Sequence, residues 1–339
     1  MKFSVVIPAR TLNDHLKENI SYLKKVRYYD FEVIIVLDEF IKINFGLKET
    51  RFRVIESGPV GPAQKRNIGA RAASGDVLAF LDDDAYPQPN WLRSAANVFL
   101  EQPDLYALGG PAVTPPNSEF MEKMSGMIFE SYLTGGSTIY RYKIAKRVEI
   151  DDYPSVNLFV KKEAFDSVGG YDVNYWPGED TKLCLELLKK YNRKFLYDPS
   201  PVVYHHRREL FKPLLQQIAR YGKHRGYFAR VFPKNSRKLQ FFVPALFFIG
   251  IIFGFILSFI IPKIWMVYSA VLFLYVILVF AESQKVTIDQ KDFKAFRYMF
   301  LGILLTNLTY GLNFISGFLF KPSSKLRSID DGSGNYIGG

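Results

Sequence analysis

Short apolar runs alternate with segments of helical periodicity along the first hundred residues. The apolar runs are 3–7, 32–37, 52–55 and 76–81, and the helical patterns cover 14–25, 62–74 and 90–101. Asn90, just before Trp91 and Leu92, is predicted to be the N-cap of the third helix. Strands that alternate with helices predict a parallel sheet covered on both faces, so the predicted fold class is α/β.

The pattern weakens from 109 to 150. Gly109-Gly110-Pro111 and Pro115-Pro116 predict turns, and Gly135-Gly136-Ser137 predicts a mobile loop. Regular patterning returns further along, at 156–160, 180–191, 195–197 and 202–204. We therefore expect one α/β domain over residues 1–205.

Three apolar runs without charge follow, at 239–261, 264–281 and 299–320, with 23, 18 and 22 residues. A helix of about 20 apolar residues matches the hydrocarbon core of a bilayer. We expect three transmembrane helices over 239–320 and a flexible tail over 321–339. The alternative, buried helices of a soluble core, is disfavoured because such helices seldom lack a polar face. The third run is diluted by polar residues and glycines, so a re-entrant segment is an alternative there.

The positive charge is concentrated just before these runs. The net charge is +11, and residues 205–238 contain ten Lys/Arg and one acid, which gives +9. Apolar residues recur there at three- or four-residue steps, so 206–238 is predicted to be a basic amphipathic interface segment suited to an anionic membrane, broken at Gly222 and Gly226. Nucleic-acid binding is not expected, because the charge is confined to this membrane-proximal part.

The position of the charges also predicts an orientation. The apolar run after Lys2 ends at Pro8, too short for a signal peptide, and Lys/Arg are abundant before the first span and between the second and third. The single cysteine, Cys184, fits a reducing compartment. We expect a multi-pass membrane protein whose α/β domain is cytoplasmic.

Polar or special residues follow three predicted strands at the point where each ends: Pro8-Ala9-Arg10, Asp38-Glu39 and Asp82-Asp83-Asp84. In open α/β sheets, ligands bind outside the carboxyl ends of the strands, so these groups are expected to share one crevice. Three aspartates after a buried strand favour a divalent cation, magnesium or manganese, which also bridges nucleotide phosphates. We expect Asp84, with Asp82, to bind the metal, and Asp82 and Asp83 to serve the nucleotide. The alternative is a solvated turn.

Residues 65–92, KRNIGARAASGDVLAFLDDDAYPQPNWL, resemble family-2 glycosyltransferases of GT-A fold. The shared features, in order, are an opening strand like SVVIPAR, an Arg-Asn-x-Gly helix, a strand ending in Asp-x-Asp, and Pro-x-x-Trp-Leu. The resemblance continues through VGGYDVNYWPGEDTKLCLELLKKY at 168–191 and covers roughly residues 3–230. It implies a GT-A type, mostly parallel sheet flanked by helices, here followed by the interface helix and the transmembrane region.

The resemblance also assigns residue roles. It implies that Asp38 contacts the nucleotide base, that Lys65 and Arg66 bind the nucleotide or its phosphates, and that Asp180 is the catalytic base. Pro8, Ala9 and Arg10 belong to the nucleotide-sugar site, and Glu179 orients the acceptor or Asp180. The alternative for Asp180 is an N-cap of a helix that begins near Thr181. Glu39 and Phe40 replace the family's usual small residues, so the identity of the base is open.

Two further groups are candidates. His205 in Tyr204-His205-His206 is a candidate metal ligand and is favoured over His206, the alternative being a solvated basic turn. The Gln-x-x-Arg-Tyr sequence of the amphipathic segment resembles a family motif that lies over the acceptor and nucleotide, with a plain interface helix as the alternative. The residues assigned to the acceptor or to gating are Gln217, Arg220, Tyr221 and Trp176.

The function implied is an inverting, metal-dependent transfer of a sugar from a nucleotide-sugar donor, a UDP-sugar first, to a membrane-proximal or lipid-linked glycan acceptor. A single displacement requires a base that removes the proton of the acceptor hydroxyl. One alternative is transfer to polyprenyl phosphate, where the need for Asp180 weakens. Another is a catalytically silent nucleotide-binding membrane scaffold.

Overall fold

The computed structural model describes residues 1–46 and 50–322, and these form two compact units. The first unit comprises Met1–Pro115 and Lys143–His206, and the second comprises Pro116–Tyr142 and Arg207–Pro322. Residues 116–142, assigned from sequence to the α/β domain, therefore group with the C-terminal helices. The predicted flexible tail lies, from residue 323 onward, outside the described residues. Each unit is described by itself below.

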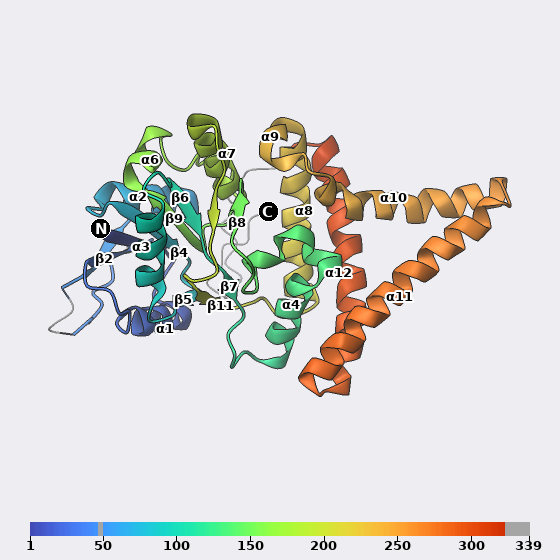
Figure 1. The fold of residues 1–339 in the computed structure, drawn as a ribbon, viewed down its shortest axis with the longest axis horizontal. Helices are drawn as coiled ribbons and strands as arrows, with labels where there is room; N and C mark the ends of the chain where they lie inside the picture. The colour runs from blue at the N-terminus through green and yellow to red at the C-terminus, as the bar shows by residue number, and fades with distance from the viewer. Residues whose placement is uncertain (47–49, 323–339) are drawn as a thin grey trace. The chain divides into compact units, whose positions relative to one another are not determined.

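An eight-stranded mixed sheet forms the centre of the first unit (Figure 1), in the order β3-β2-β1-β4-β9-β6-β10-β8. The strands β3, β2, β1 and β4 are parallel, and β9 runs antiparallel between β4 and β6. The four strands predicted from apolar runs are confirmed. The bounds are β1 Phe3–Pro8, β2 Phe31–Leu37, β3 Phe52–Glu56, β4 Val77–Leu81, β6 Ala107–Gly109, β8 Val148–Ile150, β9 Asn157–Lys161 and β10 Phe195–Tyr197.

The helices of the first unit are α1 Asp14–Leu23, α2 Pro62–Ala72, α3 Trp91–Glu101, α6 Lys162–Ser167 and α7 Glu179–Tyr191. The three helices predicted in the first hundred residues are confirmed. Helix α2 packs closely on the sheet at Gly69, where an added Cβ would lie 2.4 Å from a methyl carbon of Val6. Asn90 occupies the predicted N-cap position of α3, but its side chain makes no capping hydrogen bond.

A second, three-stranded sheet in the first unit was not predicted. Its order is β5-β11-β7, with β5 at Ala85–Pro87, β7 at Ala112–Val113 and β11 at Val203–His205. Strands β5 and β11 are antiparallel, and His205 pairs with Ala85. This register brings the end of β11 next to the aspartates that precede β5.

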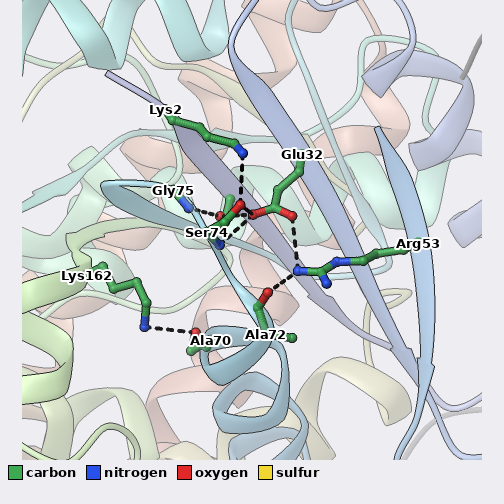
Figure 2. A network of polar contacts seen from close by, with 9 residues as sticks. Lys2, Glu32, Arg53, Ala70, Ala72, Ser74, Gly75 and Lys162 are labelled. Carbon is green, nitrogen blue, oxygen red and sulfur yellow. Dashed lines mark hydrogen bonds and ion pairs between the residues drawn. The ribbon is translucent and has the colours of Figure 1, made fainter. Parts of the chain in front are cut away.

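A network of polar contacts lies at the end of the large sheet where the parallel strands begin (Figure 2). The carboxylate of Glu32 accepts hydrogen bonds from the Ser4 hydroxyl and from the backbone N–H and hydroxyl of Ser74, each at 2.7 Å. Arg53 donates to its second oxygen at 3.1 Å. Burial alone would raise the pKa of Glu32, but these donors outweigh it and lower the pKa.

The second unit consists of helices, listed here in chain order: α4 Phe120–Glu130, α5 Tyr132–Gly135, a 3-10 helix at Gly136–Arg141, α8 Lys212–Val231, α9 Pro233–Ser236, α10 Leu239–Ile260, α11 Ile264–Gln290 and α12 Phe293–Leu319. The prediction of a loop at Gly135-Gly136-Ser137 is wrong, because these residues form helical turns. Gly135 is required by close packing, since a Cβ there would lie 2.3 Å from the carbonyl oxygen of Phe129.

Helix α8 runs without interruption through the two glycines predicted to break it. An added Cβ would lie 2.7 Å from the Tyr310 carbonyl oxygen at Gly222 and 2.1 Å from the Phe314 carbonyl oxygen at Gly226. The glycines therefore allow α8 and α12 to approach closely, which offsets their low helix propensity. The apolar face of α8 packs on α12, and the interface role of this segment stays a prediction.

Within residues 1–46 and 50–322, three helices are long and apolar enough to cross a membrane: α10, α11 and α12. Side chains of α10 and α11 are mostly exposed within the unit, with 11% and 6% of the apolar window buried, against 39% for α12. Helix α12 is continuous over 27 residues, a length of about 40 Å at 1.5 Å per residue. A continuous helix of this length is long enough to cross the hydrocarbon core of a bilayer.

Candidate active site

The carboxyl ends of β1, β2 and β4 form one edge of the large sheet, as the sequence predicted. The strands are adjacent and parallel, with Pro8 in register with Val36. The chain after β1 is held against β2, because the Ala9 N–H donates to the Val36 carbonyl and the Asp38 N–H donates to the Arg10 carbonyl. Parallel strands end at the same edge, so the residues that follow them share one site.

Lys65 lies on α2, and its side chain extends through the interior of the first unit to this edge of the sheet. Its side chain is fully buried, and its ammonium group donates to Asp38 Oδ1 and, at 2.5 Å, to the Ala9 carbonyl oxygen. Burial lowers the pKa of Lys65, and Asp38 counteracts that effect. Arg10 Nε lies 3.9 Å from the other oxygen of Asp38. This geometry places the Lys65 ammonium group against Asp38, and its role toward a nucleotide or its phosphates stays a prediction.

The three consecutive aspartates after β4 have three different partners. Asp82 accepts from Arg66, Asp83 accepts from the Asn13 amide at 3.0 Å, and Asp84 Oδ1 lies 3.2 Å from His205 Nε2. Burial, followed by the neighbouring charge of Asp84, raises the pKa of Asp83 to about 7. Asp83 thus contacts the N-cap residue of α1, whereas Asp82 and Asp84 lie close to His205; β4 ends at Leu81, so a turn rather than a continued strand arranges the three carboxylates.

The chemistry of a cation site is present at Asp82, Asp84 and His205. One ligand atom from each lies within 4.8 Å of the other two. Two carboxylate oxygens and one imidazole nitrogen fit a divalent cation of the magnesium or manganese class. Of the two neighbouring histidines, His205 lies in this cluster, whereas His206 Nε2 lies 2.7 Å from Glu18 Oε2.

Arg66 connects this cluster to the helix that carries the proposed base. The side chain is 5% exposed, and its guanidinium donates to Asp82 Oδ1 at 2.7 Å and to Glu179 Oε1 at 2.8 Å. Burial opposes its charge, but the two carboxylates outweigh burial and raise the pKa of Arg66. Asp82 and the start of α7 therefore lie on the same side of the sheet edge. The function expected from the sequence requires the aspartates after β4 and the start of α7 to share one site, and this arrangement meets that requirement.

Asp180 is the second residue of α7 rather than its cap. The N-cap is Gly178, whose φ of 118° is one that glycine adopts readily, so the alternative that Asp180 serves only as the cap is wrong. Asp180 Oδ1 accepts from the Thr181 N–H at 2.8 Å. Burial, then the charges of Glu179 and Asp152, raise the pKa of Asp180 to about 7. A carboxylate with such a pKa is suited to act as a general base near neutral pH.

The acceptor candidates are divided between the two units. Trp176 is half-buried in the segment before α7. Gln217, Arg220 and Tyr221 lie on α8 in the second unit, where Gln217 donates to the Tyr221 hydroxyl at 3.0 Å. The role of all four stays a prediction. Sequence reasoning missed the buried Asp152 and also Asn13, although an Asn before the apolar periodicity of α1 is a helix N-cap signal.

Comparison with known proteins identifies relatives in one functional class. Residues 4–169 match the family described as glycosyl transferase family 2. A glucosyl-dolichyl phosphate glucuronosyltransferase of Haloferax volcanii is 23% identical over 60% of this chain and 69% of its own. The glycosyltransferase AglE of the same organism is 30% identical over 50% of this chain and 52% of its own.

A pre-mycofactocin glycosyltransferase of Mycobacterium tuberculosis is 24% identical over 65% of this chain and 46% of its own, so the match spans about half the length of this relative and of AglE. Among solved structures, the mannosyltransferase PcManGT of Pyrobaculum calidifontis, in complex with GDP-Man and Mn²⁺, superposes with a TM-score of 0.56. It is 14% identical, and the superposition covers 95% of this chain and 88% of that one. The likeness supports a shared GT-A type fold.

Proposed function

We propose that this chain, whose residues 4–169 belong to glycosyl transferase family 2, transfers a sugar from a nucleotide-sugar donor to a lipid-linked or membrane-proximal glycan, with inversion at the anomeric carbon. The observation that carries the proposal is the Arg66 bridge. It joins Asp82, at the candidate cation cluster, to Glu179, beside the candidate base. This contact supports the assignment of the donor-binding and proton-accepting roles to residues at one sheet edge.

On the donor side, Asp82, Asp84 and His205 would hold a divalent cation, magnesium or manganese. Such a cation supplies electrostatic stabilisation of the negative charge that develops on the leaving diphosphate. Asp38, which pairs with Lys65, would accept hydrogen bonds from the nucleotide base. Mn²⁺ is present with GDP-Man in the complex of the structural neighbour, which supports the cation class.

On the acceptor side, Asp180 removes the proton from the attacking hydroxyl. The new bond forms between that oxygen and the anomeric carbon while the bond from carbon to the phosphate oxygen breaks on the opposite face. The proton ends on the Asp180 carboxylate, and the electron pair leaves with the diphosphate. Glu179, fixed by Arg66, holds the start of α7 in position. A half-buried carboxylate whose pKa is raised to about 7 suits a hydroxyl acceptor, which must lose a proton, better than polyprenyl phosphate, which is already an anion.

We further propose that the donor is a UDP-sugar and that the acceptor carries a lipid. The relative from Haloferax volcanii is named for a dolichyl phosphate-linked glycan, which supports a lipid-linked acceptor. Helices α10, α11 and α12 would cross the membrane and keep the first unit on the cytoplasmic face, close to such an acceptor. The Lys and Arg residues before the first span and between the second and third support this topology, whereas Lys321, Lys325 and Arg327 after the third span run against it.

A donor panel tests the proposal directly. The full chain in lipid nanodiscs is incubated with UDP- and GDP-sugars, Mn²⁺ or Mg²⁺ and a membrane lipid extract, and products are identified by mass. We expect one sugar nucleotide to be consumed and one lipid product to gain a sugar. Asp84→Asn should remove the response to the cation, whereas Asp14→Asn, an exposed carboxylate on α1, serves as the matched control. Nucleotide binding without transfer across the whole panel would instead support the silent scaffold.

A further inference from the structure

A second group of potential metal ligands lies in the first unit and shares no residue with the Asp82–Asp84–His205 cluster. His15 and Glu18 are three residues apart on α1, so they project from the same face of the helix. His206 follows β11 and faces them. One ligand atom of each residue lies within 4.8 Å of the other two, and the rings of His15 and His206 have centroids 4.5 Å apart. We call this group the His15 cluster.

One backbone hydrogen bond and one ring contact fix the two parts of the His15 cluster, His206 and helix α1. The His206 N–H donates to the Asp84 carbonyl oxygen at 3.0 Å, which fixes the backbone of the third ligand. Tyr22 of α1 stacks on Tyr86 of β5 with ring centroids 4.2 Å apart, which docks the helix against the small sheet. The three ligands therefore come from elements that pack against each other, and convergence does not depend on one mobile loop.

We propose that His15, Glu18 and His206 bind a cation of the zinc class, at a site separate from the Asp82–Asp84–His205 cluster. Two imidazole nitrogens and one carboxylate oxygen form the ligand set of open zinc sites, which leave a fourth position for water. The first cluster has two carboxylates and one imidazole and is the harder site, so the two clusters differ in metal preference. His15 is exposed, which gives an ion direct access from solvent.

The Glu18–His206 pair requires only a small adjustment to accept the ion, and the His15 ligand atom, within 4.8 Å of both, would move closer to them. Tetrahedral ligands with bonds of about 2.0–2.1 Å lie about 3.4 Å apart. Glu18 Oε2 and His206 Nε2, now 2.7 Å apart, would separate by about 0.7 Å, which rotation of the Glu18 side chain supplies. The bound cation would replace a hydrogen bond between two side chains by a link between α1 and the residue that follows His205.

Cobalt is the probe that separates this site from the first cluster, because tetrahedral Co²⁺ absorbs visible light. The background is the full chain in nanodiscs with Asp82→Asn and Asp84→Asn, which leaves the first cluster without its carboxylates. We expect this protein to bind one Co²⁺ with a tetrahedral spectrum and to release it to Zn²⁺. Adding His15→Ala should weaken Co²⁺ binding about tenfold or more, whereas adding Asp14→Asn, the neighbouring exposed residue, should not. Equal affinity in the two would overturn the proposal.

A second measurement avoids the double background variant, in case it folds poorly. The wild-type chain and His15→Ala are dialysed against buffered Zn²⁺, and bound metal is counted by elemental analysis. Loss of one equivalent in His15→Ala supports the site, and an unchanged count overturns it, since the Glu18–His206 contact would then be only a hydrogen bond. Neither arm measures sugar transfer, so the result is independent of the proposed transferase activity.

Discussion

Replacement of Asp180 by Asn tests the proposed chemistry most directly. The amide keeps the size of the side chain and can still accept from the Thr181 N–H, but it cannot take a proton. General bases contribute about 10²–10⁴-fold to rate, so we expect transfer to fall by about a hundredfold or more, or about 2.7 kcal/mol of transition-state stabilisation. Donor binding should be nearly unchanged, because Arg66 pairs with Glu179 and Asp82 rather than with this group.

The raised pKa of Asp180 also predicts how the rate of transfer depends on pH. Burial and the charges of Glu179 and Asp152 raise that pKa to about 7, and only the ionised carboxylate accepts a proton. At pH 6 about one tenth of the molecules are ionised, so kcat/KM should be about tenfold below its alkaline plateau. Asp152→Asn removes a neighbouring negative charge, lowers the pKa of Asp180 and should move the rise toward lower pH.

The assay is initial-rate transfer in nanodiscs from pH 5.5 to 8.5, at saturating cation, with donor affinity measured separately by calorimetry. Asp151→Asn is the matched control for Asp152→Asn, because it removes a charge one residue away that is not among the causes of the Asp180 shift. An Asp180→Asn enzyme that retains both full turnover and the wild-type pH profile would refute the assignment. A loss of donor affinity equal to the loss of rate would also refute it.

Three further substitutions test the supporting structure. Arg66→Lys keeps the charge but cannot span two carboxylates, so kcat should fall by about ten- to a hundredfold with donor KM little changed, measured by steady-state kinetics. Glu32→Gln should destabilise the fold by about 1–3 kcal/mol in chemical unfolding. Since the pKa of Glu32 is lowered by folding, this difference should be full above the pKa of an unfolded Glu and vanish as pH falls through the folded value. Gly226→Ala should lower the unfolding temperature, because the new Cβ meets the Phe314 carbonyl oxygen, whereas Gly250→Ala, with nothing within 4 Å, should not; equal effects would contradict the packing argument.

The sequence predicts well those elements whose cause is local. The strands that end at residues 8, 37 and 81 are short apolar runs, and the parallel arrangement follows from the helices between them. The meeting of polar residues at the carboxyl ends of these strands is a consequence of this topology, so it was predictable without coordinates. The apolar helices of the second unit were equally predictable, because each contains a long apolar run without charge.

Features that depend on distant packing were not predictable from the same patterns. Gly222 and Gly226 have low helix propensity and were expected to end α8, but a neighbouring helix determines their role. The helical turns around Gly135 are likewise explained by the Phe129 carbonyl oxygen that lies against them. Propensity describes an isolated segment, and tertiary contacts override it where backbones approach closely.

The contacts of Arg66 show why a sequence can reveal motifs without revealing how their residues pair. Arg66 and Glu179 are 113 residues apart, so no spacing rule indicates that they pair. Burying one arginine between two carboxylates carries a desolvation cost that often cancels the Coulombic gain, and such groups can be replaced by apolar residues without loss of stability. Stability is therefore a weak reason for the bridge. A fixed distance between the carboxylate that faces the cation and the helix that carries the base is a stronger one, because displacement of about 1 Å at a reacting centre lowers rates by about a hundredfold.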